Sequence, residues 1–177
     1  MLFVPFLLAL ILFKTRATAY VAAAVFVTGA ATDGLDGYLA RRYGASSRTG
    51  QWLDPLADKI LVVGPVVALT AQGRFPMWAA VIIIAREAGV SLLRVVLGTR
   101  GRPLPASQAA KLKTAIQLLA ITLYILPLGP EATGSRLTIL SAAVALTVFT
   151  GALYAIQAVG WLKHPDRSPP AGAEPLE

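Results

Sequence analysis

The sequence predicts an all-α membrane protein, a polytopic bundle of about six transmembrane helices. Of the 177 residues, 56% are hydrophobic and 14% charged, and the mean hydropathy is +0.66, a composition typical of chains that fold in lipid. The apolar residues also fall into six segments separated by short polar stretches that contain basic residues, Gly or Pro. We therefore expect one membrane domain, residues 1–163, followed by a flexible tail, residues 164–177, rich in Pro and Ala.

The six segments differ in length. The first holds only a dozen apolar residues, where roughly twenty are needed to span a bilayer, and no basic residues precede it as they would in a signal peptide. We interpret it as a transmembrane helix truncated at its N-terminus. The expected spans are residues 2–13, 17–39, 50–71, 77–97, 108–128 and 137–162.

Two of these spans carry carboxylates at their adjoining ends. Asp33 and Asp36 fall in the last turns of the second span, whereas Asp54 and Asp58 fall in the first turns of the third. Side chains three or four residues apart share one helix face, so two neighbouring helices would place four carboxylates around one pocket. Small residues recur near them and permit close approach of a ligand or backbone, namely Gly34, Gly37, Ala40 and Gly50.

Unpaired carboxylates among apolar helices are costly, and a bound metal would neutralise them. The chain has no cysteine, and its single histidine, His164, lies far away in the tail. The site therefore offers only oxygen ligands, which favours Mg²⁺ or Mn²⁺, with Ca²⁺ as a further possibility. The alternative is that the aspartates cap helix ends and pair with Arg41 and Arg42, but a cap needs one carboxylate rather than four.

Basic residues gather on the same side as the aspartates. The fourth span contains Arg86, Glu87 and Arg94, and ionisable residues within a membrane helix favour a functional reading. The fifth opens with Lys111 and Lys113. The alternatives are a neutralised Arg86–Glu87 pair and lysines that snorkel to the interface. Because six spans place most basic residues on this side, the positive-inside rule predicts that it faces the cytoplasm.

The spacing of the aspartate stretch resembles the signature of the CDP-alcohol phosphotransferase family. The eight matching identities are Asp33, Asp36, Gly37, Ala40, Arg41, Gly50, Asp54 and Asp58. So many fixed identities at fixed spacing are highly specific. The resemblance implies a six-helix bacterial membrane protein, usually dimeric, that binds two divalent ions and transfers a phosphatidyl group from CDP-diacylglycerol.

The resemblance also implies residue roles. Asp33, Asp36 and Asp54 would bind the metal ions, and Asp58 would be a ligand or the catalytic base. The CDP-lipid would contact Gly37, Arg41 and Ser47.

Residues beyond the signature indicate an acceptor. The Arg86-Glu87 pair with Ser91 and Arg94, and the Lys111-Leu112-Lys113-Thr114 stretch, resemble members that use sn-glycerol 3-phosphate and release CMP. The cations Arg94, Lys113, Arg86 and Lys111 would then bind the acceptor phosphate.

Two alternatives remain at this point. The same chemistry in this family can yield cardiolipin or an inositol-phosphate lipid. A cation carrier could also place four aspartates in a bundle, although a fixed cation such as Arg41 would oppose the transported ion.

The net charge of +7 is accompanied by no nucleic-acid recognition motif, and the basic residues flank apolar segments. We therefore expect no nucleic-acid partner, and contacts with membrane lipids instead.

Overall fold

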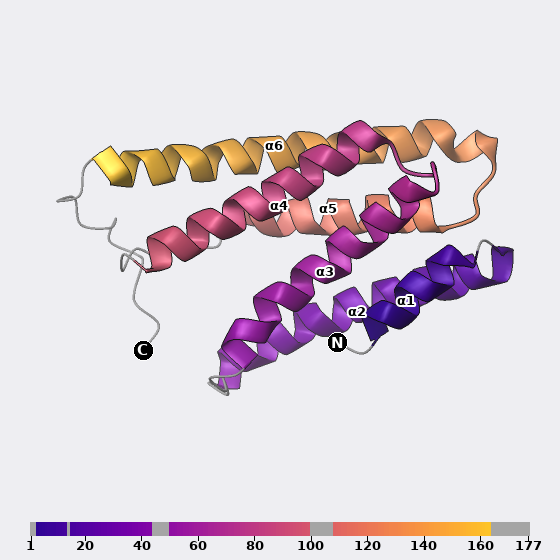
Figure 1. The fold of residues 1–177 in the computed structure, drawn as a ribbon, viewed down its shortest axis with the longest axis horizontal. Helices are drawn as coiled ribbons and strands as arrows, with labels where there is room; N and C mark the ends of the chain where they lie inside the picture. Colours follow the sequence, from indigo (N-terminus) through magenta and orange to yellow (C-terminus); the bar gives the residue numbers. More distant parts are fainter. Residues whose placement is uncertain (1–2, 14, 44–49, 100–107, 164–177) are drawn as a thin grey trace.

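The structure is a computed structural model that describes the backbone of residues 3–13, 15–43, 50–99 and 108–163. Within these ranges it also describes the side chains, except those of residues 3, 33, 36–43, 50–58, 108–110 and 161–163. The regular elements of the described residues are all helical (Figure 1). They are α1 (Phe3–Leu12), α2 (Arg16–Tyr43), α3 (Gly50–Ala71), α4 (Met77–Gly98), α5 (Gln108–Ile125), the 3₁₀ turn η1 (Pro130–Ala132) and α6 (Thr133–Lys163).

The all-α prediction is confirmed, and the predicted bounds of the third segment agree with those of α3. Helix α2 is longer than predicted, because it continues through Arg41 and Arg42 to Tyr43. Arginine is a good helix former, so a charged residue need not end a helix. Asp33 and Asp36 therefore lie in the interior of α2 rather than in its final turns.

The ends of the last two helices also differ from the prediction. Helix α5 ends at Ile125 rather than at residue 128, because Pro127 disfavours helical geometry at Leu126 and ends the hydrogen-bonded ladder. Helix α6 begins at Thr133, four residues before the predicted start. The turn η1, with Pro130 at its first position, leads directly into it.

The helices run in alternating directions, with α4, α5 and α6 on one side of the bundle and α1, α2 and α3 on the other (Figure 1). Helix α5 joins the two sides, because it packs against α6, α2 and α3. One apolar core unites the helices around fully buried residues from five of them, Phe26, Leu69, Ile83, Ile121 and Leu140.

Large apolar side chains also cover much of the outer surface. Leu92, Val95 and Ile156 are 64–68% exposed, a pattern that water does not favour over so many positions. Among the described residues, the stretch Pro130–Gly160 is long and apolar enough to cross a membrane. The other described helices do not meet this criterion of length and hydropathy. Helix α4 contains charged residues, and the described apolar part of α3, Lys59–Ala71, is shorter.

The alternating helix directions give the bundle two chemically different ends. At one end lie the end of α2, the start of α3, the end of α4 and the start of α5. At the other lie the connections from α1 to α2, from α3 to α4 and from α5 to α6. The aspartates of α2 and α3 are therefore nearer the first end, together with the basic residues of α4 and α5.

Candidate active site

The two aspartate pairs lie on helices that are joined at one end. Asp33 and Asp36 belong to α2, and Asp54 and Asp58 belong to α3. At 1.5 Å per residue, all four Cα positions lie about 6 to 15 Å along their helix from the ends that residues 44–49 connect. Helices α2 and α3 also contact each other. The backbone therefore brings both pairs to similar depths in the bundle.

The side chains of these four aspartates, and those of Gly37 and Arg41, lie outside the described set, as does the whole of Ser47. Gly34, between the first two aspartates, is described. A Cβ atom at this glycine would meet no atom of the described residues within 4 Å.

The donor set fits a hard divalent cation. Four carboxylates at helical spacings of three and four residues offer only oxygen, as Mg²⁺ and Mn²⁺ prefer. Among the described side chains, no group of three or more His, Cys, Asp or Glu residues lies together. The four aspartates, which are not in that set, are the residues that would hold the ions.

A second group of polar residues links α4, α5 and α6. The Glu87 carboxylate accepts a hydrogen bond from Lys113 Nζ and lies 3.4 Å from Arg86 Nη1. Arg86 Nη2 donates to Thr150 Oγ1 of α6 at 3.1 Å. These side chains are largely buried, with 12% of Arg86, 18% of Glu87 and 4% of Lys113 exposed. Glu87 thus links α4 to α5, and Arg86 links α4 to α6.

Tyr154 extends this group toward the end of α4. The guanidinium carbons of Arg86 and Arg94 lie 5.9 and 5.7 Å from the centre of its ring, within the range of a cation–π interaction. Arg94 itself is exposed. The group formed by Arg86, Glu87, Arg94, Lys113, Thr150 and Tyr154, here called the cation cluster, therefore contains three cations and one carboxylate.

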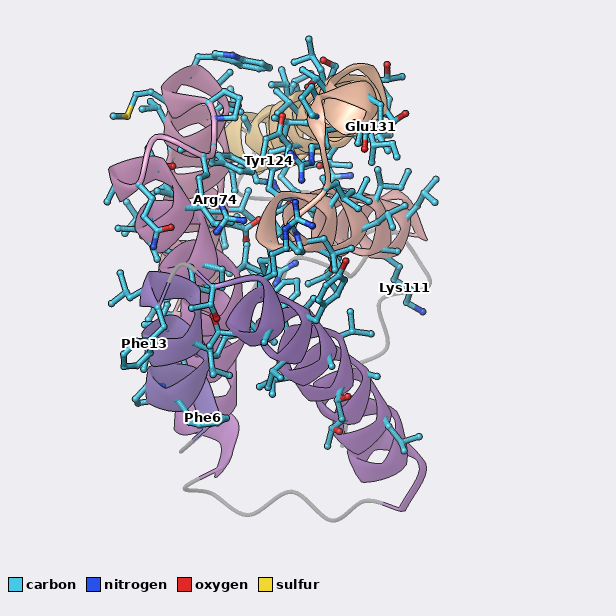
Figure 2. All side chains as sticks on the ribbon, turned by 90° about the vertical axis from the view of Figure 1, so that its right-hand side faces the viewer. Phe6, Phe13, Arg74, Lys111, Tyr124 and Glu131 are labelled. Atoms are coloured by element: carbon cyan, nitrogen blue, oxygen red, sulfur yellow. The ribbon has the colours of Figure 1, made fainter. Side chains whose placement is uncertain are left out.

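The two predicted lysines occupy different environments. Lys113 is buried against Glu87, which does not fit the alternative that it snorkels to the interface. Lys111 is exposed and points away from the bundle at its edge (Figure 2). The structure therefore brings Arg86, Arg94 and Lys113 together and leaves Lys111 outside the cluster. The Arg86–Glu87 pair that formed the other alternative is present, but Glu87 also holds Lys113.

The sequence reasoning did not identify the contribution of α6. Thr147, Thr150 and Tyr154 follow one another at steps of three and four residues, and all three are buried. This spacing marks one helix face. A polar stripe of that kind in a strongly apolar helix is the signal that could have revealed them.

Several buried polar atoms of α4, α5 and α6 lack hydrogen-bond partners among the described residues. Gln117 is 1% exposed, and neither of its amide atoms has a hydrogen-bond partner among the described residues. The same holds for Thr147 Oγ1 and Arg86 Nε. Because buried polar groups are normally paired, these atoms offer unused hydrogen-bonding capacity on the inner side of the cluster.

An apolar hollow of about 530 Å³ lies between α1 and α3. Its walls include Leu8, Leu12, Val63 and Val67, and Lys59 stands among them directly after Asp58. A surface of this kind can accept a hydrocarbon chain while a cation stays near the aspartates.

Residues 1–151 match the family model described as CDP-alcohol phosphatidyltransferase. The chain belongs to this family. Its members are membrane enzymes that generally use divalent metal ions, which agrees with the oxygen-only donor set and the exposed apolar surface.

Several bacterial proteins are similar to this chain. A Mycobacterium tuberculosis protein named probable phosphatidylglycerophosphate synthase is 42% identical over 139 residues, covering 78% of this chain and 66% of that protein. A Bacillus subtilis protein named CDP-diacylglycerol–glycerol-3-phosphate 3-phosphatidyltransferase is 38% identical, covering 59% and 54%. A Rickettsia typhi protein of the same name is 33% identical, covering 85% and 87%. The chain thus spans about two thirds of the mycobacterial relative and about half of the Bacillus one.

The central position of Glu87 generates a stability prediction. Replacing Glu87 by Gln leaves the Lys113 and Arg86 charges without a carboxylate in a largely buried site, which typically costs about 3 to 5 kcal/mol. We expect a clearly lower melting temperature in detergent, measured by thermal unfolding.

The matched control is Glu131→Gln. Glu131 is exposed in η1 and has no Lys or Arg nitrogen within 4 Å among the described residues. The melting temperature of Glu131→Gln should stay within about a degree of that of the wild type, since exposed charges contribute little to the free energy of unfolding. A Glu87→Gln variant as stable as this control would contradict the central role of Glu87.

Proposed function

We propose that this chain transfers the phosphatidyl group of CDP-diacylglycerol to sn-glycerol 3-phosphate, giving phosphatidylglycerophosphate and CMP. The observation that carries the proposal is the placement of the two aspartate pairs and the cation cluster toward the same end of the bundle. Family membership and the names of relatives at 33–43% identity support it. A metal-dependent site for a diphosphate would then lie near cations suited to a second phosphate.

In this proposal Asp33, Asp36 and Asp54 hold Mg²⁺ or Mn²⁺, as two ions, with Asp58 as a further ligand or the base. When bound, such ions neutralise the negative charge of the diphosphate and of the departing CMP. Gly37, Arg41 and Ser47 contact the CDP-lipid, and one of its acyl chains lies in the hollow between α1 and α3.

The reaction is a substitution at phosphorus. The free hydroxyl of sn-glycerol 3-phosphate forms a new bond to the phosphorus that carries the diacylglycerol. The bond from that phosphorus to the bridging oxygen breaks, and CMP leaves with the oxygen. Asp58 accepts the proton of the attacking hydroxyl, which a carboxylate can do where it is not fully committed to the metal.

The cation cluster binds the far end of the acceptor. Arg86, Arg94 and Lys113 carry three positive charges against the single negative charge of Glu87, which leaves a surplus of two. A phosphate monoester near neutral pH carries close to two negative charges, so it balances this surplus. Arginine can grip two phosphate oxygens at once, and Lys113 adds a point charge. Lys111, exposed nearby, contributes only to the approach of the acceptor.

The same charge balance argues against a cation carrier, because three cations beside the pathway would repel the ion.

We further propose that the protein is integral to a bacterial cell membrane as a six-span bundle with the active site facing the cytoplasm, and that it forms a homodimer. The exposed apolar residues of α4 and α6 and the asymmetric distribution of basic residues support this arrangement.

The metal site gives the first test of the reaction. Asp33→Asn, Asp36→Asn or Asp54→Asn should each remove metal binding and turnover together, because an amide is a weaker ligand without charge. Metal binding is measured by calorimetry and turnover by CMP release. Excess chelator should likewise abolish CMP release by the wild type, and Mg²⁺ or Mn²⁺ should restore it. Full activity in chelator is the result that rejects the metal assignment.

A separate prediction concerns Asp58. Asp58→Asn should lower the turnover number by roughly a hundred- to ten-thousand-fold, as is typical of losing a general base. Binding of CDP-diacylglycerol should persist and is measured in the absence of acceptor. A near-normal rate, or loss of both lipid and metal binding, would remove Asp58 from the role of base.

The acceptor site is tested by Arg94→Ala and Lys113→Ala. Each should raise the Michaelis constant for sn-glycerol 3-phosphate by about tenfold or more, since a hydrogen bond to a charged group is worth about 1.5 to 3 kcal/mol. The constant for CDP-diacylglycerol should change little. Separate titration of each substrate measures both values.

Arg167→Ala, in the tail beyond α6, is the matched control and should leave both constants unchanged. Lys111→Ala should give a smaller increase than Lys113→Ala. If acceptor saturation is the same in Arg94→Ala, Lys113→Ala and the control, the cation cluster does not bind the acceptor.

A further inference from the structure

The end of the bundle opposite the aspartates contains a second concentration of arginines. A cavity of about 430 Å³ opens there between the start of α2, the connection from α3 to α4 and the connection from α5 to α6. Its lining includes Thr15, Arg16, Gln72, Arg74, Pro127 and Arg136. Arg16 precedes Asp33 by 17 residues in the same helix, which is about 25 Å along the axis. The cavity is therefore separate from the proposed active site.

Two of these arginines hold the end of α5. Arg74 Nη2 donates to the carbonyls of Tyr124 and Ile125 at 3.2 and 3.0 Å. Arg136 donates from Nε to the carbonyl of Leu123 at 2.9 Å and from Nη2 to that of Leu126 at 2.7 Å. These carbonyls belong to the last turn of α5 or follow it, where no further helical N–H is available. Part of the role of Arg74 and Arg136 is thus to cap a helix.

The cap leaves a large surplus of positive charge. A helix C-terminus is equivalent to about half a negative charge, whereas Arg74, Arg136 and Arg16 bring three full positive charges. Among the described residues, no carboxylate oxygen lies within 4 Å of any of the three. Burial, and next the charge of Arg136, lower the pKa of Arg74 from its ordinary value, as expected where two cations share a site without an anion. Figure 2 shows Arg74 and Tyr124 in the middle of this end, with Glu131 at its outer edge.

Arg16 has no capping role. It is exposed at the start of α2, and no hydrogen bond or ion pair joins its side chain to the described residues. Arg16 lines the same cavity as the other two. An anion in the cavity would therefore meet one arginine without a partner among the described residues and two whose charge is only partly offset.

The surroundings indicate the source of such an anion. Large apolar side chains close in sequence to the cavity arginines are exposed, namely Phe13 before Arg16 and Leu137 beside Arg136, at 67% and 46%. A cationic cavity bordered by exposed apolar side chains is the arrangement expected at the depth of phospholipid headgroups, with acyl chains along the apolar flanks. A soluble anion would need no such flanks.

We propose that this cavity binds the phosphate of an anionic phospholipid headgroup, as a second lipid site on the face opposite the active site. Guanidinium groups suit phosphate because they donate two parallel hydrogen bonds to its oxygens. Thr15 and Gln72 add polar residues to the lining. The site is independent of the proposed reaction.

Binding to purified protein in non-ionic detergent tests the proposal. The probes are short-chain phosphatidylglycerol, short-chain phosphatidylcholine and inorganic phosphate, and the proteins are the wild type and Arg16→Glu. Wild type should prefer phosphatidylglycerol to phosphatidylcholine. Arg16→Glu should weaken phosphatidylglycerol binding about tenfold, because the reversal places a negative charge beside the phosphate. Its melting temperature should stay unchanged, since the Arg16 side chain has no hydrogen bond to the described residues.

Arg167→Glu makes the same change of charge in the tail and should bind all three probes as the wild type does. Weak binding of inorganic phosphate that also falls in Arg16→Glu would show that the phosphate alone is recognised. If the wild type binds phosphatidylglycerol but not inorganic phosphate, the whole lipid is required. The proposed site is supported by this result and also by phosphate binding that falls in Arg16→Glu. Equal phosphatidylglycerol binding by Arg16→Glu and Arg167→Glu, or no preference for the anionic lipid, would overturn the proposal. CMP release by Arg16→Glu, measured separately, shows whether the reaction itself is intact.

Discussion

The structure depends on keeping charged side chains inside an apolar bundle without leaving them unpaired. The Glu87 carboxylate meets this requirement for α4 and α5, because it holds Lys113 and lies beside Arg86. Arg86 carries the connection on to Thr150 of α6. An isolated cation in this position would be strongly unfavourable. Glu87 and Arg86 together join the three helices, and the cation cluster keeps the surplus positive charge that a phosphate ligand can satisfy.

Charge is distributed differently at the two ends of the bundle. The end near the aspartates combines carboxylates and cations, as expected where a metal-bound diphosphate and a phosphorylated acceptor meet. At the other end, arginines cap α5 through backbone carbonyls, and no described carboxylate neutralises them. The two ends therefore satisfy buried polar groups by different routes, and the cation cluster and the arginines of the opposite end each keep a positive surplus suited to phosphate.

Much of this arrangement could be predicted from the sequence. Apolar segments and their polar boundaries gave α3 its correct bounds, and the aspartate spacing identified the family. The polar stripe of α6 is visible in the sequence, but its partners are not, because Thr150 also donates to the Leu146 carbonyl of its own helix at 2.7 Å, as a threonine with no functional role would. Only the packing of α4 against α6 shows that it also accepts from Arg86. The different environments of Lys111 and Lys113 likewise depend on which helix face meets α4, since the two residues are close in sequence.

The most direct test is to identify the product. Purified protein is incubated with CDP-diacylglycerol, Mg²⁺ and one acceptor at a time: sn-glycerol 3-phosphate, inositol phosphate or phosphatidylglycerol. CMP and the lipid product are then quantified by mass spectrometry. The account predicts phosphatidylglycerophosphate and CMP in equal amounts with sn-glycerol 3-phosphate, and little turnover with the other two. CMP release that requires inositol phosphate or phosphatidylglycerol, or no CMP release with any acceptor, would contradict it.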